Sequence, residues 1–94
     1  MVRPKSCRKI GFDPDVRYFK PKGIPLRELE EIELTREEVE SLRLKNIEGL
    51  EQNDCAKKME TSQSTFQRIL ASAYKKMSLA IVEGKAIKII NDQD

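Results

Sequence analysis

Apolar residues recur at helical spacing from Pro25 onward, and this pattern predicts the first elements of the chain. Pro25 suits a first helical turn, and Leu26, Leu29 and Ile32 follow at intervals of three. We therefore predict a short helix over Pro25–Ile32.

A stronger signal for the start of a helix follows at Thr35. Thr35 precedes Glu38 by three residues, which is the spacing of a capping box, and Leu34 and Val39 occupy the two hydrophobic-staple positions. This signal predicts a helix from Arg36 to about Ile47, ended by Gly49.

The second half of the chain carries two further helical patterns and an apolar end. A helix over Gln52–Met59 would turn Cys55, Ala56 and Met59 inward. After a break at Glu60–Thr61, Ser62 is an N-cap candidate for a long helix from Gln63 to about Glu83, with Gly84 as its stop. The short, β-prone segment Ala86–Ile90 is expected to pair with the N-terminal arm or with another subunit.

The N-terminal part of the chain differs from the rest in composition. All four prolines fall within residues 1–25, and three of the five aromatic residues fall within residues 1–19. Proline excludes a long helix, and this aromatic content argues against a disordered tail. We expect an extended arm over residues 1–24 with short strands near Arg8–Phe12 and Val16–Phe19, docked on the body by Ile10, Phe12, Tyr18 and Phe19. Residues 25–94 would form a mainly α helix-turn-helix domain.

Two helices joined by a three- or four-residue turn, the second long and cationic, are typical of a helix-turn-helix. The first helix of such a unit needs a small residue where the second crosses it, and Ala56 fits. Phe66 and Ile69 follow ten and thirteen residues later as the buried residues of the second helix.

The long helix is expected to separate a core stripe from a polar face. At 100° per residue the stripe contains Phe66, Ile69, Leu70, Ala73, Met77, Ala80 and Ile81. The opposite face has no acidic residue from Thr61 to Val82, and it carries Ser64, Arg68, Ala71 and Lys75, flanked by Thr65, Gln67 and Ser72. Arg can bind guanine and Gln can bind adenine through two hydrogen bonds each, so this face suits DNA. The plainer alternative is a solvated polar face.

The stretch Leu34–Leu79 resembles region 4 of bacterial sigma factors. L-T-R-E-E-V-E-S-L-R-L-K-N-I-E-G-L is similar to the opening helix of that family, and C-A-K-K-M-E-T-S-Q-S-T-F-Q-R-I-L is similar to its helix-turn-helix. Nearly the whole chain resembles an uncharacterised prokaryotic family of small predicted DNA-binding proteins, through an R-P-x-x-C-R arm, a Y-F-K-P-x-G-I-P element and a V-E-G-K-A end. The resemblance implies a transcription regulator.

The resemblance also implies which residues meet double-stranded DNA. Base edges would be contacted by Gln63, Ser64, Thr65, Gln67 and Arg68. Apart from the resemblance, we expect phosphates to be contacted by Ser62, at the free amides of the helix N-terminus, and by Lys57, Lys58, Ser72, Lys75 and Lys76. Two positions depart from the usual pattern: Glu60 and Thr61 stand where such turns have glycine and an aliphatic residue, and Gln63 stands where a basic residue is frequent.

The charge of the chain is segregated. Residues 1–23 carry a net charge of +5, residues 27–51 carry −5 and residues 52–94 carry +2. Such segregation favours one face that meets a polyanion and another that avoids it. The arm residues Arg3, Lys5, Arg8 and Lys9 would either lie along DNA or only keep the end of the chain solvated.

Composition excludes several activities. The chain has no histidine, and its two cysteines, Cys7 and Cys55, are 48 positions apart, so neither a histidine-based nucleophile pair nor a four-ligand zinc site can be built from these residues. We expect no enzyme activity, no cofactor and no metal. No apolar run approaches a membrane span or a signal peptide, so we expect a cytoplasmic protein.

Two partner hypotheses remain. Leu79 and Val82 point away from the core stripe, which suggests a homodimer built from the end of the long helix and Ala86–Ile90. The competing function is a protein–protein adaptor that contacts RNA polymerase or a regulator through the acidic helix, including Glu37 and Glu40.

Overall fold

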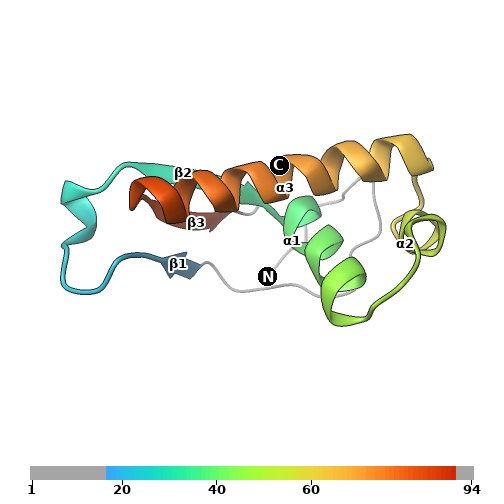
Figure 1. Ribbon diagram of the computed structural model, residues 1–94, viewed down its shortest axis with the longest axis horizontal. Helices are drawn as coiled ribbons and strands as arrows, with labels where there is room; N and C mark the ends of the chain where they lie inside the picture. The colour runs from blue at the N-terminus through green and yellow to red at the C-terminus, as the bar shows by residue number, and fades with distance from the viewer. Residues whose placement is uncertain (1–16, 91–94) are drawn as a thin grey trace, which may run out of the picture.

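The computed structural model describes residues 17–90, which form three α-helices and a three-stranded mixed sheet (Figure 1). The strands are β1 (Arg17–Phe19), β2 (Glu31–Thr35) and β3 (Ala86–Ile90). The helices are α1 (Arg36–Leu42), α2 (Gln52–Lys58) and α3 (Gln63–Glu83), with a 3₁₀ turn η1 (Leu26–Glu28) and a π-helical turn η2 (Arg43–Ile47). The helices confirm the expected mainly helical organisation, and β3 confirms the expected strand at Ala86–Ile90, but the three-stranded sheet makes this a small mixed α/β domain.

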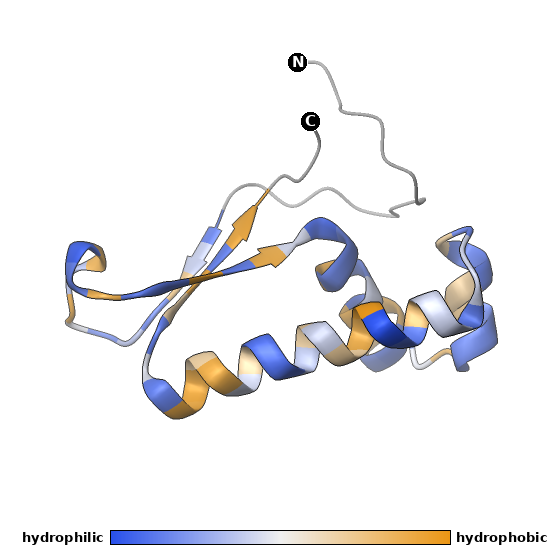
Figure 2. Cartoon of the chain, turned by 90° about the horizontal axis from the view of Figure 1, so that it is seen from above, coloured by the Kyte–Doolittle hydropathy of each residue, from blue (hydrophilic) through white to orange (hydrophobic). Residues whose placement is uncertain are grey.

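The long helix α3 is shared by two small cores. Near its start, Phe66 and Leu70 pack with residues of η2 and α2. Further along, Ala73 packs with Leu34 of β2 and Ile89 of β3. Figures 1 and 2 show this division: α2 lies at the beginning of α3, and the sheet lies along its second half.

The sheet has the order β1-β3-β2, so the C-terminal strand is the central one. β3 pairs antiparallel with β1, placing Arg17 opposite Ile89, and parallel with β2, placing Leu34 opposite Ile89. The expected pairing of Ala86–Ile90 with the arm is confirmed for residues 17–19. The other expected strand, near Arg8–Phe12, lies outside the described residues, as do Ile10 and Phe12.

The capping box at the start of α1 is confirmed. The N–H of Glu38 donates to Thr35 Oγ1 at 3.2 Å, and the N–H of Thr35 donates to Glu38 Oε1 at 2.9 Å. β2 therefore passes directly into α1 without a loop, because Thr35 ends the strand and caps the helix.

The predicted helix over Pro25–Ile32 is wrong in its second half. Only Leu26–Glu28 is helical, as a 3₁₀ turn, and Ile32 lies inside β2. Ile32 and Leu34 alternate with exposed glutamates, and pairing with β3 stabilises that alternation as a strand. Tertiary pairing thus outweighs the spacing of Leu26, Leu29 and Ile32.

The predicted core stripe of α3 is also too long. Phe66, Leu70, Ala73 and Ala80 are buried, but Ile81 is 74% exposed. The sheet covers one side of α3 only, and Ile81 lies beyond its cover beside the more exposed Val82. Within the described residues, no helix combines the length and the apolar character needed to cross a bilayer.

Candidate nucleic-acid interface

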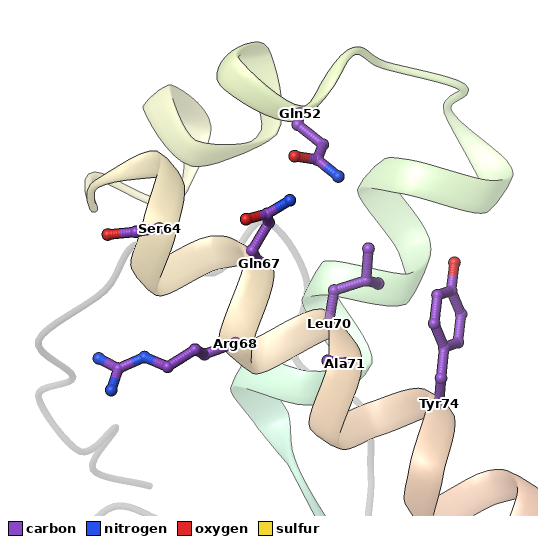
Figure 3. A pocket seen from close by; sticks show the side chains of 7 residues that line it. All are labelled: Gln52, Ser64, Gln67, Arg68, Leu70, Ala71 and Tyr74. Carbon is purple, nitrogen blue, oxygen red and sulfur yellow. The ribbon is translucent and has the colours of Figure 1, made fainter.

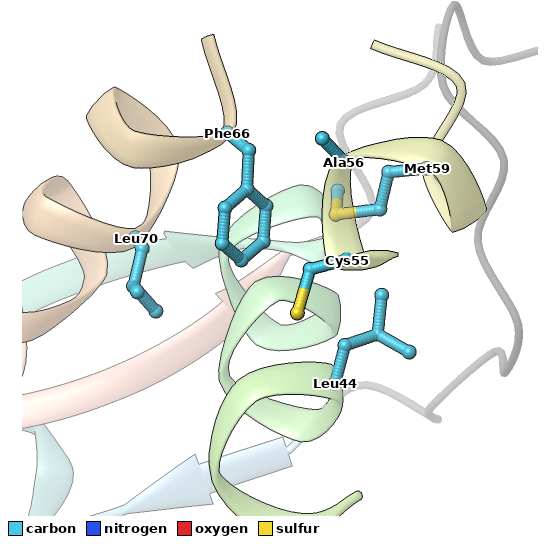
Figure 4. Packing of buried hydrophobic residues seen from close by; sticks show 6 residues of the cluster. All are labelled: Leu44, Cys55, Ala56, Met59, Phe66 and Leu70. Atoms are coloured by element: carbon cyan, nitrogen blue, oxygen red, sulfur yellow. The ribbon is translucent and has the colours of Figure 1, made fainter. Parts of the chain in front are cut away.

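The packing between α2 and α3 fixes how α3 presents its outer face. Cys55 and Ala56 of α2, and Met59 at its C-cap, are at most 3% exposed, and they form one buried cluster with Phe66, which has no exposed surface (Figure 4). Ala56 lies in the same buried cluster as Phe66, and its small side chain suits the close helix crossing expected there. All three residues that were expected to face inward are therefore buried, and this cluster packs the N-terminal end of α3 against α2.

Burial also raises the pKa of the Cys55 thiol above its ordinary value. A buried thiol with a raised pKa is a poor nucleophile and a poor metal ligand. Cys55 therefore acts as a small apolar residue of this core, and Cys7 lies outside the described residues.

The turn between α2 and α3 is a Schellman motif. The N–H of Thr61 donates to the carbonyl oxygen of Ala56, and the N–H of Glu60 donates to that of Lys57, each at 3.0 Å. Glu60 has φ +57°, the left-handed conformation that normally selects glycine. The departure noted at Glu60 thus falls on the one residue of the turn that needs a positive φ.

Ser62 is the N-cap of α3, as expected. Its Oγ accepts a hydrogen bond from the N–H of Thr65 at 3.1 Å and donates one to Thr65 Oγ1 at 2.9 Å. The Thr65 amide is consequently occupied by the cap. An anion at this helix end would meet the amides of Gln63 and Ser64 instead.

Most of the expected base-contacting residues share one accessible surface. Gln63, Ser64, Gln67 and Arg68 are exposed, and Thr65 is half-buried. An open depression of about 680 Å³ lies on this side of α3 (Figure 3). It is lined by Gln52, Ser64, Gln67, Arg68, Leu70, Ala71 and Tyr74.

Two residues of this surface were missed from the sequence. Gln52, the first residue of α2, points into the same space as Gln67 (Figure 3). Tyr74 lies seven residues after Gln67, two helical turns further along the same side, and its hydroxyl donates to Asn46 Oδ1 at 3.1 Å. Helical periodicity could have indicated Tyr74, whereas Gln52 joins only through the crossing of the two helices.

The expected phosphate-contacting residues divide into two groups. Lys57 and Lys58 in the last turn of α2, and Lys75 on α3, are exposed. Ser72 and Lys76 instead bind the Glu38 carboxylate: Ser72 donates to Oε2, and Lys76 Nζ lies 2.9 Å from Oε1. Lys76 also donates to the carbonyl oxygen of Glu33 at 2.8 Å. The arm residues Arg3, Lys5, Arg8 and Lys9 lie outside the described residues.

Glu38 is the electrostatic link between α1 and α3. Burial by itself would raise the pKa of this carboxyl, but hydrogen bonds from Ser72, the Thr35 amide and Lys76, together with the charge of Lys76, lower the pKa below its ordinary value. The carboxylate is therefore charged at neutral pH and holds Lys76 on the inner side of α3.

The acidic helix presents fewer carboxylates than its composition suggests. Glu40 is 2% exposed and binds Arg43 at 2.9 Å, and Glu38 is 6% exposed. Glu37 is half-buried. Across residues 17–90, no group of three acidic or cysteine side chains is arranged to hold a metal ion.

Comparison with known sequences decides the family. Residues 1–93 match the family described as "Protein of unknown function DUF134". The chain belongs to this family. Similar proteins include UPF0251 proteins of Halothermothrix orenii, 51% identical over 88 residues, and of Desulforudis audaxviator and Moorella thermoacetica, each 56% identical over 89 residues.

These relatives are longer proteins. The alignments cover 94–95% of this chain but only 65%, 58% and 60% of the three relatives. The chain thus spans about three fifths of the length of the curated relatives it matches. No solved structure matches the chain. The family match includes the residues of α2 and α3, and the family description names no activity.

Proposed function

We propose that this DUF134 protein binds double-stranded DNA sequence-specifically through the exposed side of α3 and thereby regulates transcription. The observation that carries the proposal is the α2–turn–α3 unit: a tight Schellman turn, close packing of Ala56 against Phe66, and an outer face free of acidic residues. A helix-turn-helix like that of sigma region 4 places its second helix in the major groove, and we assign the same role to α3.

The chemistry of the exposed face suits base edges. The guanidinium of Arg68 can donate two hydrogen bonds to guanine O6 and N7, and the amide of Gln67 can form two hydrogen bonds with adenine N6 and N7. Gln63 and Ser64 project from the first turn, where helix N-termini reach deepest into the groove. Thr65, already bonded to Ser62, offers mainly its methyl group to a thymine.

Phosphate contacts fall to the residues that remain accessible. Lys57 and Lys58 lie on α2 beside the turn, and Lys75 extends the basic surface along α3. Ser72 and Lys76 could join them only by leaving Glu38, so we assign them a smaller share of the binding. Gln52 joins the interface as a residue from the start of α2 that faces the same depression as Gln67.

The proposal includes a homodimer that uses the end of α3. Val82 is 80% exposed and Leu79 is 38% exposed, so an apolar surface is present there. Because β3 is paired along both edges, it has no free edge for strand addition. Within this proposal, the contact between subunits is therefore made by Leu79 and Val82 of α3. Ala86–Ile90 does not itself pair with the second subunit.

The adaptor alternative receives less support. An acidic docking surface needs carboxylates that point outward, but Glu38 and Glu40 are buried against partners of their own chain. Exposed carboxylates lie outside α1, among them Glu28 of η1, Glu31 and Glu33 of β2, and Glu48 and Glu51 after η2.

The test is fluorescence-anisotropy titration of a random duplex pool over a salt series, followed by selection of bound sequences. Arg68→Ala is compared with Arg27→Ala, because Arg27 is also exposed but lies in η1 at the other end of α3 (Figure 1). We expect Arg68→Ala to weaken binding to the selected site about 5- to 150-fold and to relax preference at one base pair. Arg27→Ala should bind as the wild type does.

Three outcomes would count against the proposal. Absence of binding at low salt by a folded protein would favour the adaptor function. Equal weakening by Arg68→Ala on every sequence would make Arg68 a phosphate contact. Equal effects of the two arginine variants would mean that binding is diffuse and does not use α3.

A further inference from the structure

A second, apolar groove lies on the side of the molecule between β1, α1 and η2. Its volume is about 730 Å³, and its apolar lining comes from Phe19, Val39, Leu42, Ile47, Met77 and Ile89. Ile47 is 78% exposed and Phe19 is 55% exposed within the described part of the chain. Large apolar side chains open to water in this way indicate a surface that another segment covers.

We infer that the groove is the seat of the N-terminal arm of the same chain, with Ile10 and Phe12 as the side chains that fill it. The first described residue, Arg17, itself lines the groove. Sixteen residues precede it, and they include this apolar pair at a spacing of two, which places both side chains on one face of an extended segment.

The direction of the chain supports this occupant. β2 runs parallel to β3 and leads into α1, whereas β1 runs antiparallel to β3. Traced backward from Arg17, the chain therefore heads toward α1 and η2, which form the far side of the groove (Figure 1). An arm that continues this direction enters the groove without a turn.

Length and charge fit as well. Phe12 lies five positions before Arg17, an extended reach of about 18 Å, whereas Val39 and Ile47 are only about 12 Å apart along a helix axis. Asp13 and Asp15 lie between Phe12 and Arg17 in the sequence, and Arg17 and Arg43 are the charged residues among those that line the groove. Arg43 is already bound to Glu40 and Glu48, so Arg17 is the basic lining residue that these acidic side chains would meet.

Docking would also bring the arm close to the proposed DNA interface. Tyr74 lines both the apolar groove and the depression beside Arg68. Arg8 and Lys9 directly precede Ile10, so a docked arm directs two basic residues toward that side. This consequence rests on the proposed function, but the docking itself does not.

The experiment uses the full chain without DNA. The photoreactive residue p-benzoylphenylalanine replaces Phe12, or Val2 as the control, and cross-linked peptides are mapped by mass spectrometry after illumination. We expect the probe at position 12 to attach within the same chain to α1, η2 or Met77, and the probe at position 2 not to. Attachment outside the groove, or only to a second chain, would overturn the inference; the latter result would assign the groove to a second copy.

Thermal unfolding supplies a second readout. Ile10→Ser with Phe12→Ser should lower Tm by about 4–8 °C, while Val2→Ser should leave it unchanged. An unchanged Tm for the double variant would overturn the inference. Because neither readout involves DNA, failure of the docking and failure of the proposed function are distinguishable.

Discussion

The N–H of Thr61 donates to the carbonyl oxygen of Ala56 at 3.0 Å and closes the turn that sets the angle between α2 and α3. This bond requires the residue before Thr61 to adopt the left-handed conformation, and that residue is Glu60, with φ +57°. A non-glycine residue in this region carries strain of about 1 kcal/mol.

Glu60→Gly should therefore stabilise the protein. We expect the free energy of unfolding to rise by about 0.5–1 kcal/mol, measured by urea denaturation. Glu60→Ala is the matched control, because it removes the charge but keeps the Cβ atom. If Glu60→Ala stabilises equally, charge and not backbone strain is the cause.

The two substitutions Glu60→Gly and Glu60→Ala also separate the effect of charge on DNA binding from the effect of backbone strain on stability. Both substitutions remove an acidic group from the turn beside the proposed interface, so both should tighten binding at low salt. Only Glu60→Gly should also change the stability.

Ser62 joins a structural role to a proposed functional one, since its Oγ accepts from the Thr65 amide at 3.1 Å. Ser62→Ala should lower the free energy of unfolding by about 1 kcal/mol through loss of the cap. Ser64→Ala, two residues further along and exposed, should change stability little. Urea denaturation of the two variants side by side measures the difference.

Ser62→Asp separates the two roles of this position. Aspartate is as good an N-cap as serine, so stability should be retained. Its charge should repel a phosphate at the same helix end, so DNA affinity should fall. Retained affinity in Ser62→Asp would exclude a phosphate contact at the N-terminus of α3.

The Glu38 carboxyl gives the fold a defined acid sensitivity. Its pKa in the folded state is lowered from the ordinary value of 4.5, because the hydrogen bonds from Ser72, Thr35 and Lys76 outweigh the opposing effect of burial. The folded protein thus holds this proton less tightly than the unfolded chain, and the stabilisation is complete above pH 4.5. It is lost as the pH falls through the lower, folded-state pKa.

Glu38→Gln should consequently lower the free energy of unfolding at pH 7 by about 1–3 kcal/mol, the usual effect of losing hydrogen bonds to a charged group. The gap between wild type and variant should shrink as the pH falls below 4.5, measured as Tm at half-unit pH steps. Glu31→Gln, an exposed carboxyl in β2, is the control. A gap that stays constant from pH 7 to pH 3 would show that the loss comes from packing and not from charge.

The helical part of the fold was predictable because its signals are local. The capping box of Thr35 and Glu38, the Ser62 cap and the stops at Gly49 and Gly84 each act over a few residues, and each was confirmed. The buried side of α2 and the first half of α3 followed from periodicity for the same reason.

The sheet was only partly predictable because its pairing is not local. Ala86–Ile90 could be identified as a strand from its β-prone residues, but β2 could not, since its parallel partner is 55 positions away in the register Glu31–Ala86. The ties of Ser72 and Lys76 to Glu38 were hidden for the same reason: 34 and 38 residues separate the partners. The sequence alone therefore predicted the polar face of α3, but it did not predict that Ser72 and Lys76 are bound to Glu38.

The exposed end of α3 leads to a final prediction, on oligomeric state. Val82 is 80% exposed and Leu79 is 38% exposed, and in the proposed homodimer both are covered by a second copy. Leu79→Ser with Val82→Ser should convert dimer to monomer in sedimentation equilibrium at micromolar concentration, because burial of such side chains supplies most of the driving force. Ile47→Ser is the control: Ile47 is as exposed as Val82 but lies in η2, away from this surface. A wild-type chain that remains monomeric at high micromolar concentration would refute the dimer and would require this protein to contact DNA as a single unit, without paired half-sites.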